Sequence, residues 1–79
     1  MNPVKFIYEF FDESHVQSPR KVLEVKEALH FAKGDKIWMD ELSRQNLLTI
    51  HEIEHLFQIQ ESGVICTIRI RCRLGDRIA

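Results

Sequence analysis

The sequence predicts a small, mainly β domain: a five-stranded antiparallel barrel or meander that ends in a hairpin. Two observations carry this prediction. Residues 64–74 alternate apolar and polar side chains without a break, as a strand with one buried face does. In residues 53–59, Ile53, Phe57 and Ile59 share one face with His55, and Ser62-Gly63 between the two runs suits a two-residue hairpin turn.

The position of that turn predicts the register of the hairpin. It sets Phe57 opposite Ile68, so that one face of both strands is apolar. On the other face the expected charge pairs are Glu54 with Arg71 and Glu52 with Arg73. A slip by one residue would lose these pairs and turn the apolar face to water.

Length and composition indicate one globular domain spanning residues 1–79. Hydrophobic residues make up 44% of the chain, charged residues 29%, and the formal net charge is −1. This balance excludes any argument from overall charge for a nucleic-acid or membrane surface. No run approaches the ~18 apolar residues of a membrane helix, and no signal pattern opens the chain, so we expect a cytoplasmic protein.

The two cysteines fit that location. Cys66 and Cys72 lie six positions apart on one predicted strand, which separates them by ~20 Å. A disulfide cannot bridge this distance. We expect two free thiols that behave as small buried apolar groups.

The first predicted strand covers residues 4–11 and is rich in aromatic side chains. Phe6, Tyr8 and Phe10 share one face, while Ile7 and Phe11 share the other. Apolar side chains on both faces predict a central strand or a contact between copies of the chain. The polar residues 12–19 follow as a loop.

Residues 19–33 have two readings. Ser18 as N-cap, Pro19 at the first helical position and Gly34 beyond the end favour an amphipathic helix. Two strands are the alternative that we prefer, with Gly34-Asp35 as a turn that pairs residues 31–32 with residues 37–38. Their inward-facing residues would be Leu23, Val25, Leu29 and Phe31.

Residues 49–59 are ambiguous in the same way. A capping box, Thr49-x-x-Glu52, favours a short helix. The longer match with residues 64–74 favours a strand. In that strand a bulge near His51 would let Ile50 and Ile53 share a face. An α+β fold with helices near 19–33 and 49–59 is therefore the alternative fold class.

Three stretches together, residues 34–39, 48–57 and 64–74, look like a barrel of the SH3-like kind. The likeness lies at the level of a superfold that hosts many unrelated functions. It implies a small five-stranded antiparallel barrel and no particular activity.

His51-Glu52-Ile53-Glu54-His55 matches H-E-x-x-H and resembles the zinc-binding helix of zincin metalloproteases. On a helix, the two histidines would bind zinc and Glu52 would act as general base. On a strand, His51 and His55 would be ~14 Å apart and Glu52 would face the other way. A zinc-dependent hydrolase is thus a remote alternative. We expect no metal site, no cofactor and no enzyme.

Arg69, Arg71 and Arg73 form the candidate binding site. They lie on one face of the last strand, each ~7 Å from the next, a spacing that could follow successive phosphates. Glu52 and Glu54 would neutralise part of this row, and no exposed aromatic side chain is interleaved to stack on bases.

The sequence therefore favours a non-enzymatic binding module that docks a protein partner through a sheet face, an edge or loops. A second copy of the chain is among the candidate partners. A nucleic-acid-binding module that uses Arg69, Arg71 and Arg73 is the alternative. No membrane interaction is expected.

Overall fold

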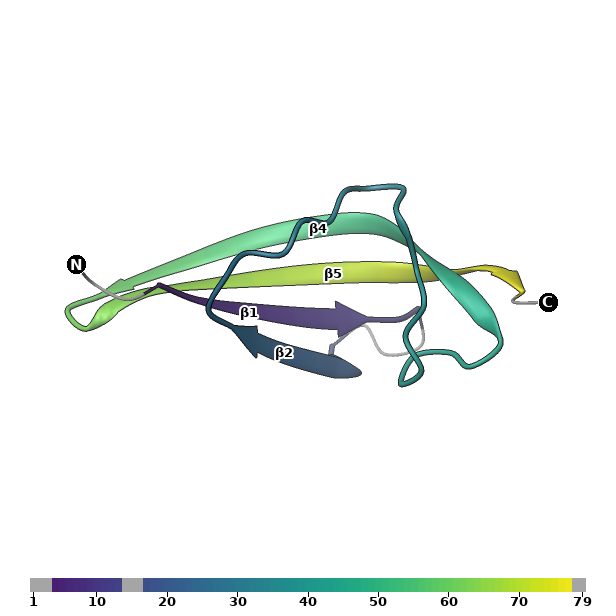
Figure 1. Cartoon of the computed structure of the whole chain (residues 1–79), viewed down its shortest axis with the longest axis horizontal. Coiled ribbons are helices and arrows are strands. Elements are labelled where there is room, and N and C mark those ends of the chain that lie inside the picture. Colours follow the sequence, from purple (N-terminus) through teal and green to yellow (C-terminus); the bar gives the residue numbers. More distant parts are fainter. Residues whose placement is uncertain (1–3, 14–16, 78–79) are drawn as a thin grey trace.

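A computed structural model describes residues 4–13 and 17–77, which form a single mixed sheet of five strands. The strands are β1 (Val4–Phe11), β2 (Lys21–Val25), β3 (Lys36–Ile37), β4 (Asn46–Gln60) and β5 (Gly63–Arg77). Their order across the sheet is β2-β1-β5-β4-β3, and the sheet curls into a half-barrel (Figure 1). The described ranges contain no helix, and so none that could cross a membrane. The predicted mainly β class is confirmed, and the α+β alternative is wrong.

The antiparallel arrangement predicted for the whole sheet is wrong for one pair of strands. β1 runs parallel to β5, with Phe6 opposite Cys66 and Phe10 opposite Ile70. On its other side, β1 pairs antiparallel with β2. The chain must cross the sheet before β5 can return beside β1, and a parallel pair of this kind requires such a long connection. The prediction that β1 is a central strand is confirmed.

The hairpin of β4 and β5 forms with the predicted faces but with a different register. Phe57 lies opposite Cys66, not opposite Ile68, and the turn is Glu61-Ser62. Gly63, which follows the turn, has a φ of 150°, a conformation that glycine accepts readily. The register is displaced by two residues, which leaves every side chain on its predicted face because the strand period is also two.

The predicted bulge in β4 is confirmed. The register shifts between Ile50 and Glu52, so that Ile50 faces Cys72 while Ile53 faces Ile70. The extra residue, His51, turns both isoleucines to the same side of the sheet. Ile50 is fully buried, and Ile53 packs against the core.

Residues 19–33 form neither the helix nor the two strands that the sequence predicted. Only Lys21–Val25 is a strand, and residues 26–35 then cross the sheet without regular structure. Asp35 does close a turn, because its amide donates to the carbonyl of Ala32 over 3.0 Å. β3 pairs with β4 at Leu48 and Thr49, so the predicted pairing of residues 31–32 with residues 37–38 is wrong.

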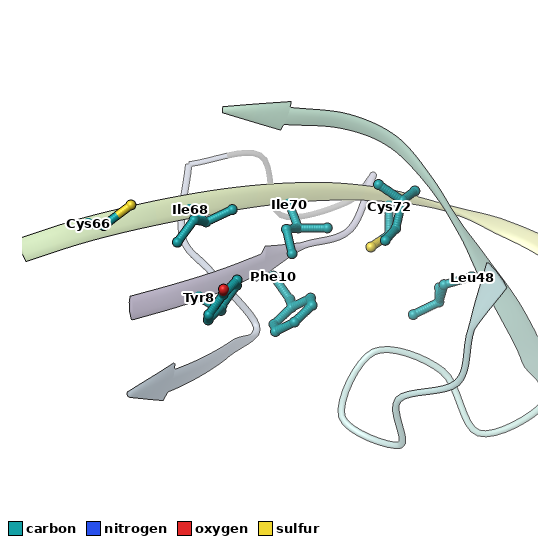
Figure 2. Packing of buried hydrophobic residues seen from close by; sticks show 8 residues of the cluster. Tyr8, Phe10, Leu48, Cys66, Ile68, Ile70 and Cys72 are labelled. Atoms are coloured by element: carbon teal, nitrogen blue, oxygen red, sulfur yellow. The ribbon is translucent and has the colours of Figure 1, made fainter. Parts of the chain in front are cut away.

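The core lies on the concave face, between the sheet and this crossing stretch. Figure 2 shows the side chains of β1 and β5 pointing to the same side, where they meet the start of β4. The buried cluster consists of Tyr8, Phe10, Leu48, Ile50, Cys66, Ile68, Ile70 and Cys72. Phe31, from the crossing stretch, contacts the rings of Tyr8 and Phe10 edge to face. The distances between ring centres are 5.6 Å to Tyr8 and 5.7 Å to Phe10.

The hydroxyl of Tyr8 fastens the crossing stretch, residues 26–35, to the sheet. It donates to the carbonyl of Leu29 over 2.9 Å and accepts from the amide of Leu29 over 2.7 Å. The far end is held at β4, where Ile50 exchanges backbone bonds with Gly34 and Asp35. These bonds satisfy backbone groups that the irregular stretch cannot pair within itself.

Candidate functional site

The apolar face of the sheet continues past its cover at the end where the hairpin turns. Two rows of side chains cross the strands there, according to the register: Val4, Val64 and Ile59 in one row, and Val25, Phe6, Cys66 and Phe57 in the next. We call these seven residues the hairpin face. Ile59 is 83% exposed, Phe57 67% and Val4 45%, so the face is open chiefly on the β4 side.

The hairpin face is open because the crossing stretch covers the sheet further along. Leu29 is bonded to Tyr8, which lies in the row after Phe6. From there the stretch runs to Ile50, away from the hairpin turn (Figure 1). β4 and β5 have 15 residues each, whereas β1 has 8 and β2 has 5. The hairpin is therefore longer than the segments that could cover it.

The outer edge of β4 is open beside the same face. β3 pairs only with Leu48 and Thr49, and the crossing stretch reaches β4 at Ile50. From Glu52 to Gln60, no strand of the described residues pairs with this edge. An open edge presents unpaired backbone donors and acceptors, which a second extended chain can bind.

The composition of the open edge also favours pairing. Leu56-Phe57-Gln58-Ile59-Gln60 contains no charge, no lysine and no proline. Natural proteins commonly use lysine, proline or bulges to prevent an exposed edge from pairing with another chain. In β4 the bulge lies before Glu52, so the last part of the strand has none of these protections.

The arginine row lies on the opposite face of the sheet, where carboxylates accompany it. The Nε of Arg69 lies 3.2 Å from a carboxylate oxygen of Glu9. Arg71 forms an ion pair with Glu54, and its guanidinium lies 5.3 Å from the centre of the Phe11 ring. The row is therefore interleaved with acidic side chains from β1 and β4.

The predicted pairs within this row are met in part. Glu54 reaches Arg71 diagonally, since its direct neighbour is Arg69. Arg73 lies opposite Thr49, so the expected pairing with Glu52 is wrong. Arg73 instead lines a pocket of about 260 Å³ together with Arg71 and His51. Phe11, Asp12 and Glu13 complete this pocket, so acidic side chains also border the row here.

A double-mutant cycle tests the diagonal pair. Glu54→Ala and Arg71→Ala should show a coupling of about 1 kcal/mol or less, because partly exposed ion pairs contribute little. Urea unfolding of the two single variants and the double variant measures it. The matched control is Glu54→Ala with Arg73→Ala, which should show no coupling. Stronger coupling to Arg73 than to Arg71 would contradict the observed register.

The H-E-x-x-H motif lies on a strand. His51 occupies the bulge, and His55 faces Ile68 on the core side of β4. The helical spacing that would bring both histidines to one zinc ion is therefore not formed. Among residues 4–13 and 17–77, no three His, Cys, Asp or Glu side chains cluster as metal ligands would.

Cys66 and Cys72 are free and buried on the core face of β5. Burial raises the pKa of the Cys66 thiol. Burial, assisted by the negative charge of Asp12, raises the pKa of Cys72 from 9.0 to about 11. Both thiols therefore keep their protons at neutral pH and are poor nucleophiles.

The reactivity of Cys72 follows from this pKa. In the folded protein it should react with iodoacetamide at pH 8 roughly a hundredfold more slowly than in urea, since thiolate is the reactive form. The folded thiol holds its proton to higher pH than the unfolded one, so stability should fall as pH rises from 9 towards 11. Mass spectrometry of alkylated peptides follows the reaction. Equal rates in the folded and unfolded protein would contradict the burial of Cys72.

The open part of the hairpin face was not predicted from the sequence. Alternation places Phe57 and Ile59 correctly on the apolar face, but that face was expected to be core throughout. The sequence signal for the open part was the length of the runs 53–59 and 64–74, which exceeds that of the other apolar segments.

Comparison with protein-family models, with curated proteins and with solved structures finds no match to this chain.

Proposed function

We propose that the protein is a non-enzymatic binding module that docks an extended polypeptide on the hairpin face and the adjoining edge of β4. The exposure of Ile59 and Phe57 carries this proposal, because these side chains continue the rows of the core into solvent. Apolar patches of this kind commonly mark sites of protein association. An added strand would bond to the open edge and place alternate side chains against the patch.

The surroundings of the arginines support a protein partner over a nucleic acid. Arg69 and Arg71 are engaged by Glu9 and Glu54, which lowers the net positive charge of the row. Phosphate binding would have to compete with these carboxylates.

The likeness to SH3-like barrels remains a prediction. It rests on the number of strands and on the curvature of the sheet. The free thiols are compatible with the cytoplasmic location that we include in the proposal.

The experiment is capture of polypeptides from an extract of the native host on the immobilised protein. Ile59→Arg should reduce capture at least about tenfold, because it places a charge within the apolar contact. The fold should survive, since Ile59 is largely exposed. Val22→Arg is the matched control. Like Ile59, Val22 is an exposed β-branched apolar residue, but it belongs to β2 and lies away from the hairpin turn.

Two outcomes would overturn the proposal. One is equal recovery of the same polypeptides by wild type and Ile59→Arg. The other is capture that disappears after nuclease treatment or falls steeply with salt, which would indicate phosphate contacts. Capture that is insensitive to salt and lost only with Ile59→Arg is the result that the proposal predicts.

A further inference from the structure

We infer that the polypeptide docked on this edge is β4 of a second copy of the chain, paired antiparallel about Leu56. This inference rests on the proposed function, because it names the partner of the same surface. The open edge from Glu52 to Gln60 is roughly 30 Å long. Two copies joined there would form one continuous sheet with their half-barrels at opposite ends.

The register follows from using the whole edge. The midpoint between Glu52 and Gln60 is Leu56, so antiparallel pairing of the full edge with itself is centred on that residue. It sets Glu52 opposite the partner's Gln60 and Glu54 opposite the partner's Gln58. No carboxylate then faces another directly. Parallel pairing in register would set each glutamate beside its own copy, which is destabilising.

The apolar side of the interface is also complementary in this register. Ile59 lies opposite the partner's Ile53, and Phe57 lies opposite the partner's His55. Ile59 is the most exposed large apolar residue among those described, whereas Ile53 already packs against the core. Each copy would therefore place its exposed Ile59 beside the partner's Ile53, whose position is fixed by its packing against the core. Cross-strand apolar pairs of this kind stabilise a sheet by about 0.2–1 kcal/mol each.

The two turns that meet at each end of this interface, Glu61-Ser62 and residues 33–36, carry net charges of opposite sign. When Gln60 of one copy pairs with Glu52 of the other, Glu61 of the first copy lies beside the Gly34-Asp35 turn of the second, which is bonded to Ile50. Lys33 and Lys36 flank that turn, so this segment has a net positive charge. The acidic hairpin turn of each copy thus meets the more basic turn of the other. This complementarity favours a second copy over an unrelated strand.

The two halves of the edge also complete each other. Residues 52–55 carry both glutamates, whereas residues 56–60 are uncharged. In the antiparallel register the uncharged half of one copy always covers the acidic half of the other.

The experiment is sedimentation equilibrium of the full chain, with three variants. Wild type should be dimeric. Leu56→Lys and Leu56→Glu should each weaken dimerisation at least about tenfold, because like charges would meet across the two-fold axis. A one-to-one mixture of these two variants should dimerise again, since lysine would then face glutamate. Thr67→Lys is the control, because Thr67 lies directly opposite Leu56 but on the inner strand β5.

The outcomes separate this inference from the proposed function. Dimerisation of Leu56→Lys as strong as that of wild type, or no recovery in the mixture, would overturn pairing about Leu56. A monomeric wild type that still captures another protein through Ile59 would overturn the second copy and leave the binding module standing. A monomer that captures nothing would overturn both. Circular dichroism of each variant confirms that the sheet is intact.

Discussion

Phe10→Ala is expected to lower the free energy of unfolding by about 3–5 kcal/mol, the cost of truncating a fully buried aromatic side chain. Phe10 is 1% exposed and lies beside Ile70 in the centre of the sheet. It also contacts the ring of Phe31, so its loss would loosen the crossing stretch as well as the core. In a domain of this size, such a loss is a large fraction of the total free energy of unfolding.

Urea unfolding monitored by circular dichroism measures the effect. Val22→Ala is the control, because this exposed side chain on β2 should change stability by only about 0.5 kcal/mol or less. If Phe10→Ala fails to fold, Phe10→Leu provides the measurement, with a smaller loss in the same direction. A loss below about 1 kcal/mol for the alanine variant would contradict the position of Phe10 in the core.

Tyr8→Phe is expected to cost about 1–3 kcal/mol, although it removes a single oxygen atom. The Tyr8 hydroxyl bonds both backbone groups of Leu29, so phenylalanine would leave a donor and an acceptor without their partner. The ring itself, with its contact to Phe31, would be retained. The loss therefore belongs to the hydroxyl and not to packing.

Amide hydrogen exchange locates this effect. The amide of Leu29 should exchange faster in Tyr8→Phe, because it loses its acceptor. The amide of Ile50, which donates to Asp35 at the other end of the crossing stretch, is the internal control. If both amides respond equally, the hydroxyl does not act locally, and the crossing stretch opens as one unit.

The hairpin illustrates what alternation can predict and what it cannot. The period of two assigned every residue of 53–59 and 64–74 to the correct face. A displacement of two residues keeps all faces unchanged, so alternation carries no information about it. The turn decides the register, and the chain turns at Glu61-Ser62, with Gly63 as the first residue of β5. The bulge at His51 was predictable from Ile50 and Ile53. In a regular strand these two residues would face opposite sides of the sheet, and an extra residue between them is needed to bury both on one side.

The rest of the fold depends on contacts between residues distant in the sequence. Apolar side chains on both faces of β1 predicted a central strand, but nothing local indicates that β5 is its parallel neighbour. Residues 26–35 have both helical and strand patterns, and the structure uses neither. Their backbone groups bond to Tyr8 and Ile50, which are tertiary partners that no local pattern reveals.

The candidate site was predicted only in part for the same reason. The arginine row was visible because it is regular along one strand, and its position on the polar face followed from parity. Its acidic neighbour Glu9 comes from β1, which the predicted topology had not placed beside β5. The open hairpin face depends on where the crossing stretch ends, and that is a property of the assembled sheet.

Amide hydrogen exchange of β4 at increasing protein concentration is the most direct test of the docking surface. Alternate amides between Glu52 and Gln60 should be unprotected in dilute protein and become protected as the second copy, or another captured polypeptide, binds the edge. The amides of β5 between Val64 and Arg71 should stay unchanged, because this strand has a neighbour on each side. Protection of β4 that is the same at every concentration, and the same when a captured partner is added, would contradict the account.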